Sequence, residues 1–131
     1  EINGGYISGF VAAESRREMK PLLKQLVGDP GLVNRKMIDD ILKFKRLDGV
    51  TEALIEISSG FLSGDKQTVD LRGAIADLPM PVNVIWGSED QIIPAAHASG
   101  LPDNVTVNIL DGFGHLVQLE AASDVNKLLQ S

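Results

Sequence analysis

The chain contains no cysteine, only two histidines and no long run of apolar residues. Without cysteine there is no disulfide framework, thiolate metal site or cysteine nucleophile, and two histidines are too few for a histidine-rich metal site. A membrane span needs roughly 18 consecutive apolar residues, and the first residues lack the basic and apolar regions of a signal peptide. We therefore expect a protein of a reducing compartment, the cytoplasm, that makes no membrane contact.

What the chain does contain is an ordinary globular composition, with 131 residues of which 44% are hydrophobic and 23% charged. The net charge of −6 is unevenly distributed. Residues 1–60 hold nine basic and nine acidic residues, whereas residues 61–131 hold three basic and nine acidic ones. Binding to a nucleic-acid backbone rests on many lysine and arginine contacts, so the acidic balance argues against a nucleic-acid partner.

The first half has the apolar period of amphipathic helices in four pieces, at 6–11, 19–27, 33–42 and 50–61. Turn-forming residues at 28–31 and 48–49 separate the later pieces. Pro21 suits the second helix only in its first turn, where the missing N–H costs no bond. The apolar stripes favour packing over a ligand-facing role. Charged residues between the stripes are typical of a solvated helix face: Arg35, Lys36, Asp39, Asp40, Lys43, Lys45, Arg46 and Asp48.

The second half alternates strands and helices. After a linker at 63–67 and a short helical pattern over 71–78, β-branched and aromatic residues predict buried strands at 82–86 and 105–110. Helical turns are expected at 92–98 and a helix at 119–129. Strands joined by helical crossovers form a parallel sheet covered on both faces, and the chemistry of such sheets lies just beyond the carboxyl ends of the strands.

Two candidate catalytic residues follow these strands, Asp90 after the first and His115 after the second. Considered alone, Asp90 is explained as the N-cap of the next helical turn. Considered alone, His115 is explained as a surface histidine in a glycine-rich turn. Taken together, an acid and a histidine at one sheet edge can come within hydrogen-bond reach. The carboxylate then fixes the imidazole tautomer, and the imidazole takes a proton from a hydroxyl nucleophile. Acid followed by histidine is the chain order of the α/β-hydrolases.

Two strand-end motifs carry a family resemblance. The segments VNVIWGSEDQIIP at 82–94 and GFGHLVQLE at 112–120 resemble the last two strand ends of the α/β-hydrolase fold. The resemblance implies that Asp90 is the triad acid, that His115 is the general base and that Glu120 begins the packing of the last helix. Residues 8–17 and 43–50 resemble the cap helices of one group, the hydrolase-like dihydrolipoamide acetyltransferase component of acetoin dehydrogenase.

The expected fold class is therefore α/β, as the C-terminal part of an α/β-hydrolase fold. Residues 1–64 are the expected helical cap, and residues 65–131 are the expected strand–helix part of the core. No serine has glycine two positions before and two positions after it, so the G-x-S-x-G elbow of this fold is missing. We expect a C-terminal fragment that is inactive alone, with its serine, its oxyanion-hole loop and any lipoyl domain outside the chain.

Two other features are set aside. Gly112-Phe113-Gly114 does not continue as a dinucleotide fingerprint, because Val117 occupies the third glycine position. The second histidine, His97, is expected to be a surface residue rather than a second base.

The resemblance implies that the intact enzyme moves an acetyl group between dihydrolipoamide and coenzyme A. Both would be substrates, no cofactor would be bound directly by this chain, and the partners would be other subunits of a 2-oxo acid dehydrogenase-type complex. Two alternatives stay open. An esterase or carbon–carbon bond hydrolase would use the same acid and base, since water and a thiol are alternative acceptors from one acyl-enzyme. The isolated chain could instead be a non-catalytic module that self-associates through its open strand edges.

Overall fold

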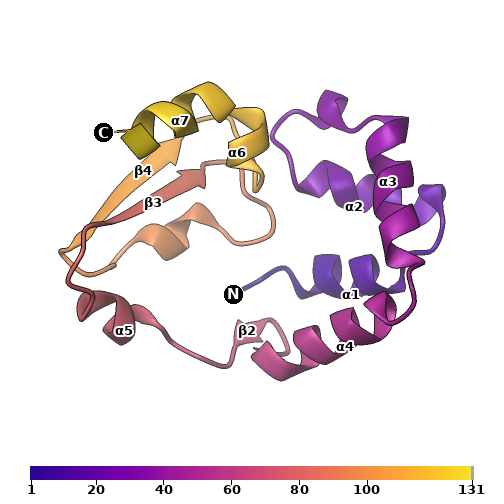
Figure 1. The fold of residues 1–131 in the computed structure, drawn as a ribbon, viewed down its shortest axis with the longest axis horizontal. Helices are drawn as coiled ribbons and strands as arrows, with labels where there is room; N and C mark the ends of the chain where they lie inside the picture. The colour runs from indigo at the N-terminus through magenta and orange to yellow at the C-terminus, as the bar shows by residue number, and fades with distance from the viewer. Residues whose placement is uncertain (131) are drawn as a thin grey trace.

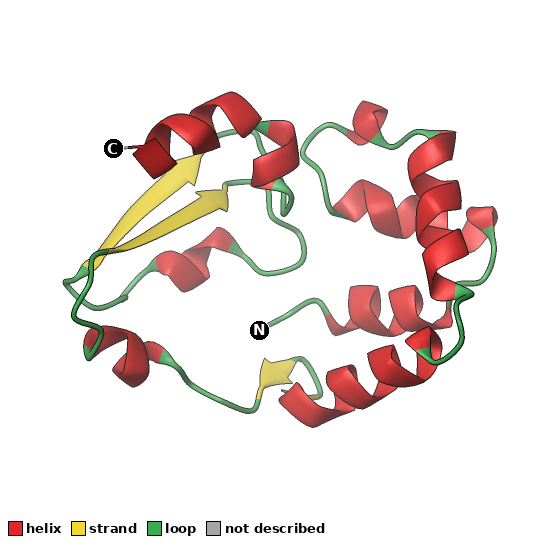
Figure 2. Cartoon of the chain, in the orientation of Figure 1, coloured by secondary structure: helices red, strands yellow, loops and turns green. Residues whose placement is uncertain are grey.

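The computed structural model describes residues 1–130 and shows a helical segment followed by a strand–helix segment (Figures 1 and 2). The helical segment consists of α1 (Gly4–Ala12), α2 (Arg16–Gln25), η1 (Pro30–Leu32), α3 (Arg35–Lys45) and α4 (Val50–Phe61). The strand–helix segment consists of β1 (Leu62–Ser63), β2 (Lys66–Gln67), α5 (Arg72–Ala76), β3 (Val82–Gly87), η2 (Ala95–Ala98), β4 (Val105–Leu110), α6 (Val117–Glu120) and α7 (Ala122–Gln130). Ser131, the last residue of the expected core part, lies outside the described residues.

The two long strands pair in parallel, as the crossover pattern predicts. The register runs from Val82 opposite Val105 to Gly87 opposite Leu110, so both strands end at the same level. The expectation that both sheet faces are covered is wrong for the described chain. Val107 and Ile109 lie on one face, because side chains alternate along a strand, and they are 37% and 46% exposed. A sheet of two strands with short flanking helices leaves that face open.

The expected linker at 63–67 contains a small element that the pattern missed. Leu62–Ser63 and Lys66–Gln67 pair in antiparallel fashion as β1 and β2. Gly64 has a φ of +66°, which a two-residue connection between antiparallel strands requires. Strands of two residues are too short to show an alternation of apolar and polar residues, so the pattern does not predict them.

The buried core lies mainly in the helical segment. Met19 and Leu23 of α2 are fully buried, Val27 is nearly so, and α3 adds Ile38 and Leu42. Ile92, from the loop after β3, joins the same cluster, and Leu116 packs against it. The core therefore extends from the helices to the loops that follow the two parallel strands, and it fixes those loops against α2.

Helix α2 begins earlier than its apolar stripe suggests. Ser15 is the N-cap, and its side chain and that of Glu18 form a reciprocal capping box with the backbone. Pro21 therefore lies inside the helix, which corrects the expectation that it occupies the first turn. The missing N–H leaves the carbonyl of Arg17 without its usual helical partner. Pro21 is on the exposed side of α2, where water can replace that partner.

Lys45 is buried and does not belong to a solvated face. Its ammonium group donates to the backbone carbonyls of Phe10, Val11 and Ala13, at the end of α1. Burial lowers the pKa of Lys45, because removal from water penalises the charged form. The lysine acts as a C-terminal cap that ties α3 to α1. Along residues 1–130, no helix has both the length and the apolar character that a membrane crossing requires.

Candidate functional site

The Asp90 carboxylate is buried in the loop after β3 and is held by donors from that loop and from β3 itself. Its side chain is 3% exposed. Oδ1 accepts from the backbone N–H groups of Ile92 and Ile93, at 2.8 and 3.0 Å. Oδ2 accepts from the indole Nε1 of Trp86, at 2.9 Å. A buried carboxylate needs such donors, and these three hold it in one orientation.

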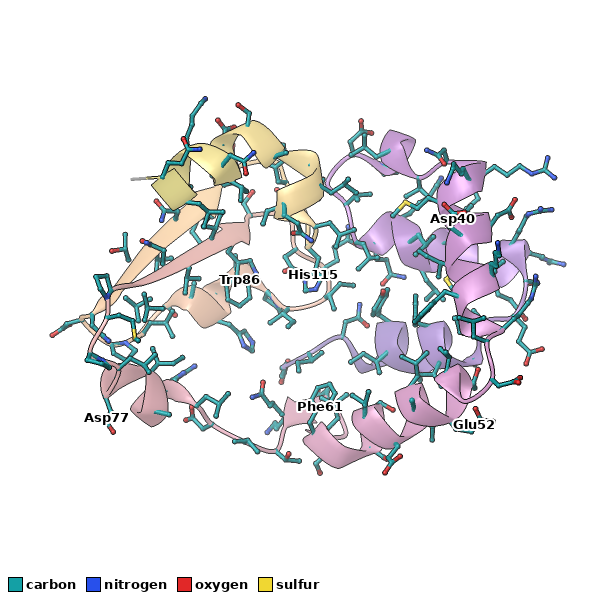
Figure 3. The ribbon with its side chains drawn as sticks, in the orientation of Figure 1. Asp40, Glu52, Phe61, Asp77, Trp86 and His115 are labelled. Atoms are coloured by element: carbon teal, nitrogen blue, oxygen red, sulfur yellow. The ribbon has the colours of Figure 1, made fainter. Side chains whose placement is uncertain are left out.

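His115 lies against this carboxylate. Nδ1 of His115 is 2.8 Å from Oδ2 of Asp90, and the side chains of Trp86 and His115 lie close together where the strand ends face the helical segment (Figure 3). We assign the proton to Nδ1, because the carboxylate oxygen is an acceptor. The lone pair of Nε2 is then free to take a proton. No residue of the described chain bonds to Nε2, and the imidazole side chain is 33% exposed.

The register of the sheet explains why the two residues meet. Because Gly87 and Leu110 end their strands side by side, the following loops run together. The N–H of Ser88 donates to the carbonyl of Leu110, and that of Glu89 donates to the carbonyl of Phe113, both at 2.9 Å. The expected proximity of acid and histidine at one sheet edge is thus what the structure shows. Their catalytic roles remain a prediction.

Close contacts between backbones fix the His115 loop on its other side. The N–H of His115 donates to the carbonyl of Leu26 at 2.9 Å, and that of Leu116 donates to the same oxygen at 3.1 Å. A Cβ atom added to Gly87 would lie 2.1 Å from the carbonyl oxygen of Gly114. One added to Gly114 would lie 2.7 Å from the nitrogen of Gly28. Gly87 and Gly114 therefore allow close packing, whereas Gly112 has open space around it and a φ of +80°.

Three contacts of this site were missed from the sequence. The β-branched and aromatic run at 82–86 predicts only a buried strand for Trp86, whereas the structure places its indole beside the acid four residues later. The carbonyl of Leu26 carries no sequence signal, because it is a main-chain group from another element. Glu120 is the last residue of α6, shortly before α7 begins, and its carboxylate accepts from the N–H groups of Gly28 and Gly114, which the sequence pattern does not predict.

His97 does not join the pair. It lies in η2, half-buried, and its Nε2 is 3.0 Å from the amino nitrogen of Glu1. Ser88 does not join it either, since its hydroxyl donates to Asp111. Among residues 1–130, no serine is hydrogen-bonded to His115, and no group of three histidine or acidic side chains could hold a metal ion.

The surface has one hollow next to Trp86 and another next to Lys45. One of about 500 Å³ adjoins Trp86, and its lining includes Leu71, Ile93, His97 and Leu101. The other, of about 640 Å³, lies beside Lys45 and includes neither Asp90 nor His115 in its lining. The first hollow reaches Trp86 but, like the second, has neither Asp90 nor His115 in its lining, so neither hollow lies at the pair itself.

Comparison with known sequences gives two relatives of the same description. The chain is 48% identical over 129 residues to the dihydrolipoyllysine-residue acetyltransferase component of the acetoin cleaving system of Cupriavidus necator. It is 48% identical over 126 residues to the component of that name from Pseudomonas putida. The matches cover 98% and 96% of this chain but 34% and 33% of those proteins. The chain thus spans about a third of the length of these relatives. No family model matches it.

Comparison with solved structures gives hydrolases. A mutant of a meta-cleavage product hydrolase superposes with a TM-score of 0.81 at 22% identity, over 98% of this chain and 49% of that one. A 2-hydroxy-6-oxo-6-phenylhexa-2,4-dienoate hydrolase from a Rhodococcus species superposes with a TM-score of 0.79 at 19% identity, over 98% and 48%. At such identities the likeness establishes the fold alone.

Proposed function

We propose that this chain, a homologue of part of the acetyltransferase component of acetoin cleaving systems with the fold of the C-terminal part of the α/β-hydrolases, supplies the acid and base of an acyltransferase. The 2.8 Å contact between Nδ1 of His115 and Oδ2 of Asp90 carries the proposal. In this role Asp90 orients the imidazole and stabilises its charged form, and His115 is the general base. Residues 1–64 would be the cap over the acyl site, and residues 65–131 would be the core part that carries both residues.

The chemistry needs a serine hydroxyl from outside the described residues. As its Oγ attacks the carbonyl carbon of an acetyl thioester, Nε2 of His115 takes the hydroxyl proton. Collapse of the tetrahedral intermediate breaks the carbon–sulfur bond, and the departing thiolate receives that proton from His115. A second thiol then transfers its proton to Nε2 while its sulfur attacks the acetyl-serine, and the serine oxygen recovers a proton as it leaves.

Homology supports the choice of thiols. The matched relatives are described as dihydrolipoyllysine-residue acetyltransferases of an acetoin cleaving system. We infer dihydrolipoamide and coenzyme A as the two thiols, with the other subunits of a 2-oxo acid dehydrogenase-type complex as partners. The thiols are substrates in this scheme, and the chain binds no cofactor of its own.

The decisive experiment compares the two histidines in an intact enzyme that carries this chain together with its serine. His115→Ala should lower kcat for acetyl transfer by about 10³- to 10⁴-fold, because the base is lost. His97→Ala is the matched control and should leave kcat within about threefold, since His97 contacts neither Asp90 nor His115. Normal turnover by His115→Ala would refute the assignment.

A second measurement separates transfer from hydrolysis. With acetyl-coenzyme A as donor, an acyltransferase yields acetyl-dihydrolipoamide when the dithiol is present, whereas an esterase-type enzyme yields acetate regardless of the thiol. Release of acetate alone would favour the hydrolase alternative.

The isolated chain provides a third test, because it contains no serine bonded to His115 among its described residues. It should neither hydrolyse p-nitrophenyl acetate nor be labelled by a fluorophosphonate. Stoichiometric labelling would contradict our account of the nucleophile. Sedimentation of the same chain tests the non-catalytic alternative, which expects self-association, and a clean monomer would count against it.

A further inference from the structure

The loop that carries His115 is held by the end of α2 and by Glu120 of α6, the helix that the loop enters. Residues 111–116 connect β4 to α6 without regular structure. The backbone N–H of His115 donates to Leu26, which lies just after α2, rather than to the sheet. The position of the base is therefore set by the contact between this loop and the end of α2.

Glu120 spans that contact with a single carboxylate. Oε1 accepts from the N–H of Gly114 at 3.0 Å, and Oε2 accepts from the N–H of Gly28 at 2.7 Å. Gly114 directly precedes His115, and Gly28 follows the Leu26–Val27 pair. One side chain thus bonds both sides of the junction, and both bonds are charge-assisted and half-buried.

The backbones of the His115 loop and of the end of α2 are in close contact at this junction. The α-carbon of Gly114 approaches Val27 and Gly28 so closely that an added Cβ would lie 2.7 Å from their backbone atoms. Displacement of the Glu120 carboxylate would leave the half-buried N–H groups of Gly28 and Gly114 without this acceptor. The loss would weaken the attachment of the loop to the end of α2.

We propose that Glu120 is a positioning residue for His115, which holds the imidazole in hydrogen-bond contact with Asp90 by locking Gly114 to the end of α2. Glu120 contacts neither Asp90 nor the imidazole and so acts only through the backbone. The part of this proposal that concerns turnover rests on the proposed function, whereas the part that concerns His115 geometry does not.

The test follows the proton on Nδ1 of His115 by NMR in the chain itself. Glu120→Gln should speed the exchange of that proton with water by about ten- to a hundredfold, because the amide NH₂ group cannot accept from an N–H and one bond of the pair is lost. The matched control is Glu89→Gln, at an exposed acid beside Asp90, which should change that rate by less than about twofold. The core amide of Leu23 should exchange at the wild-type rate in both variants.

Two outcomes overturn the proposal. The first is an Nδ1 exchange rate in Glu120→Gln within about twofold of wild type. The second is a parallel rise at the Leu23 amide, which indicates general loosening. If Glu120→Gln does not fold, the wild-type chain decides the matter. Through-hydrogen-bond couplings from the Gly28 and Gly114 nitrogens to the Glu120 carboxylate carbon should then be seen, with both amides exchanging as slowly as the Nδ1 proton. Their absence refutes the proposal.

In the intact enzyme, Glu120→Gln should lower kcat by about tenfold with KM unchanged, because the base is displaced while the substrate contacts remain. If wild-type enzyme transfers no acyl group, the proposed function fails, and the NMR result still decides the role of Glu120.

Discussion

Trp86 donates its indole N–H to the same carboxylate oxygen of Asp90 that accepts from His115. The two contacts to Oδ2 measure 2.9 and 2.8 Å, and the other oxygen accepts from two backbone N–H groups. All four donors converge on one buried carboxylate. Because Trp86 is part of β3, the direction in which Asp90 faces His115 is tied to the strand itself.

Removal of the indole donor tests whether Trp86 orients the Asp90 carboxylate. Trp86→Phe should lower kcat of the intact enzyme by about tenfold, the usual effect of losing one hydrogen bond to a charged group. Steady-state kinetics measures the change, and circular dichroism establishes that the variant is folded. An unchanged kcat in a folded variant would show that the backbone donors alone orient Asp90.

The close backbone contact at Gly114 should make this position intolerant of a methyl group. Gly114→Ala should lower the free energy of unfolding by about 3 kcal/mol, because its Cβ would overlap the backbone at Val27 and Gly28. Gly73→Ala is the control, since a Cβ there meets open space inside α5, and it should raise stability by about 0.5–1 kcal/mol. Urea denaturation measures both. Equal effects of the two variants would argue against the close contact.

The buried lysine provides a stability prediction within the helical segment. Lys45→Met should lower the free energy of unfolding by about 3 kcal/mol, because three carbonyls at the end of α1 lose their donor. Lys43→Met removes an exposed lysine from the same helix and should change it by less than about 0.5 kcal/mol. A Lys45 variant as stable as the Lys43 variant would contradict the capping role.

Stability in acid should depend on Asp39. The Arg16 guanidinium bonds to this carboxylate and holds its pKa below the usual 3.8. The folded protein thus binds this proton less readily than the unfolded chain. The pair stabilises the fold above pH 3.8, and its contribution is lost as the pH falls through the lowered pKa.

Asp39→Asn should therefore be less stable than wild type at neutral pH, and the difference should shrink in acid. Urea unfolding from neutral to acidic pH measures the difference in stability between the two proteins. High salt should reduce this difference, because the Arg16–Asp39 pair is exposed. Asp103→Asn, at an exposed aspartate without an ion pair among the described residues, should show no such pH-dependent difference. A gap between wild type and Asp39→Asn that persists at low pH would contradict the prediction.

The longer helices and the two long strands were predictable because each has a local cause, whereas the two-residue strands β1 and β2 have none in the sequence pattern. The strands at 82–86 and 105–110 and the parallel pairing are confirmed, and the α/β-hydrolase expectation agrees with the solved structures that the chain resembles. Local rules also explain the error at Pro21. The apolar stripe of α2 begins only at Met19, whereas the Ser15–Glu18 capping box places the start of the helix earlier.

What sequence reasoning could not supply depends on main-chain atoms and on distant segments. The acceptor for the His115 backbone is a carbonyl at Leu26, and carbonyls carry no residue-specific signal. Lys45 looks like any surface lysine until the end of α1 is placed beside it. The exposed Val107 and Ile109 depend on what covers the sheet, which alternation along one strand cannot reveal.

The bond between Glu120 and Gly28 is a contact of long range along the chain. It joins residues 92 positions apart, so it closes a loop through most of the chain. Contacts of such long range are entropically costly to close, and they form after local helices and turns have gathered. The His115 loop reaches its place only when the end of α2 and the end of β4 have come together. Proton-transfer competence would therefore be among the last properties that the folding chain acquires.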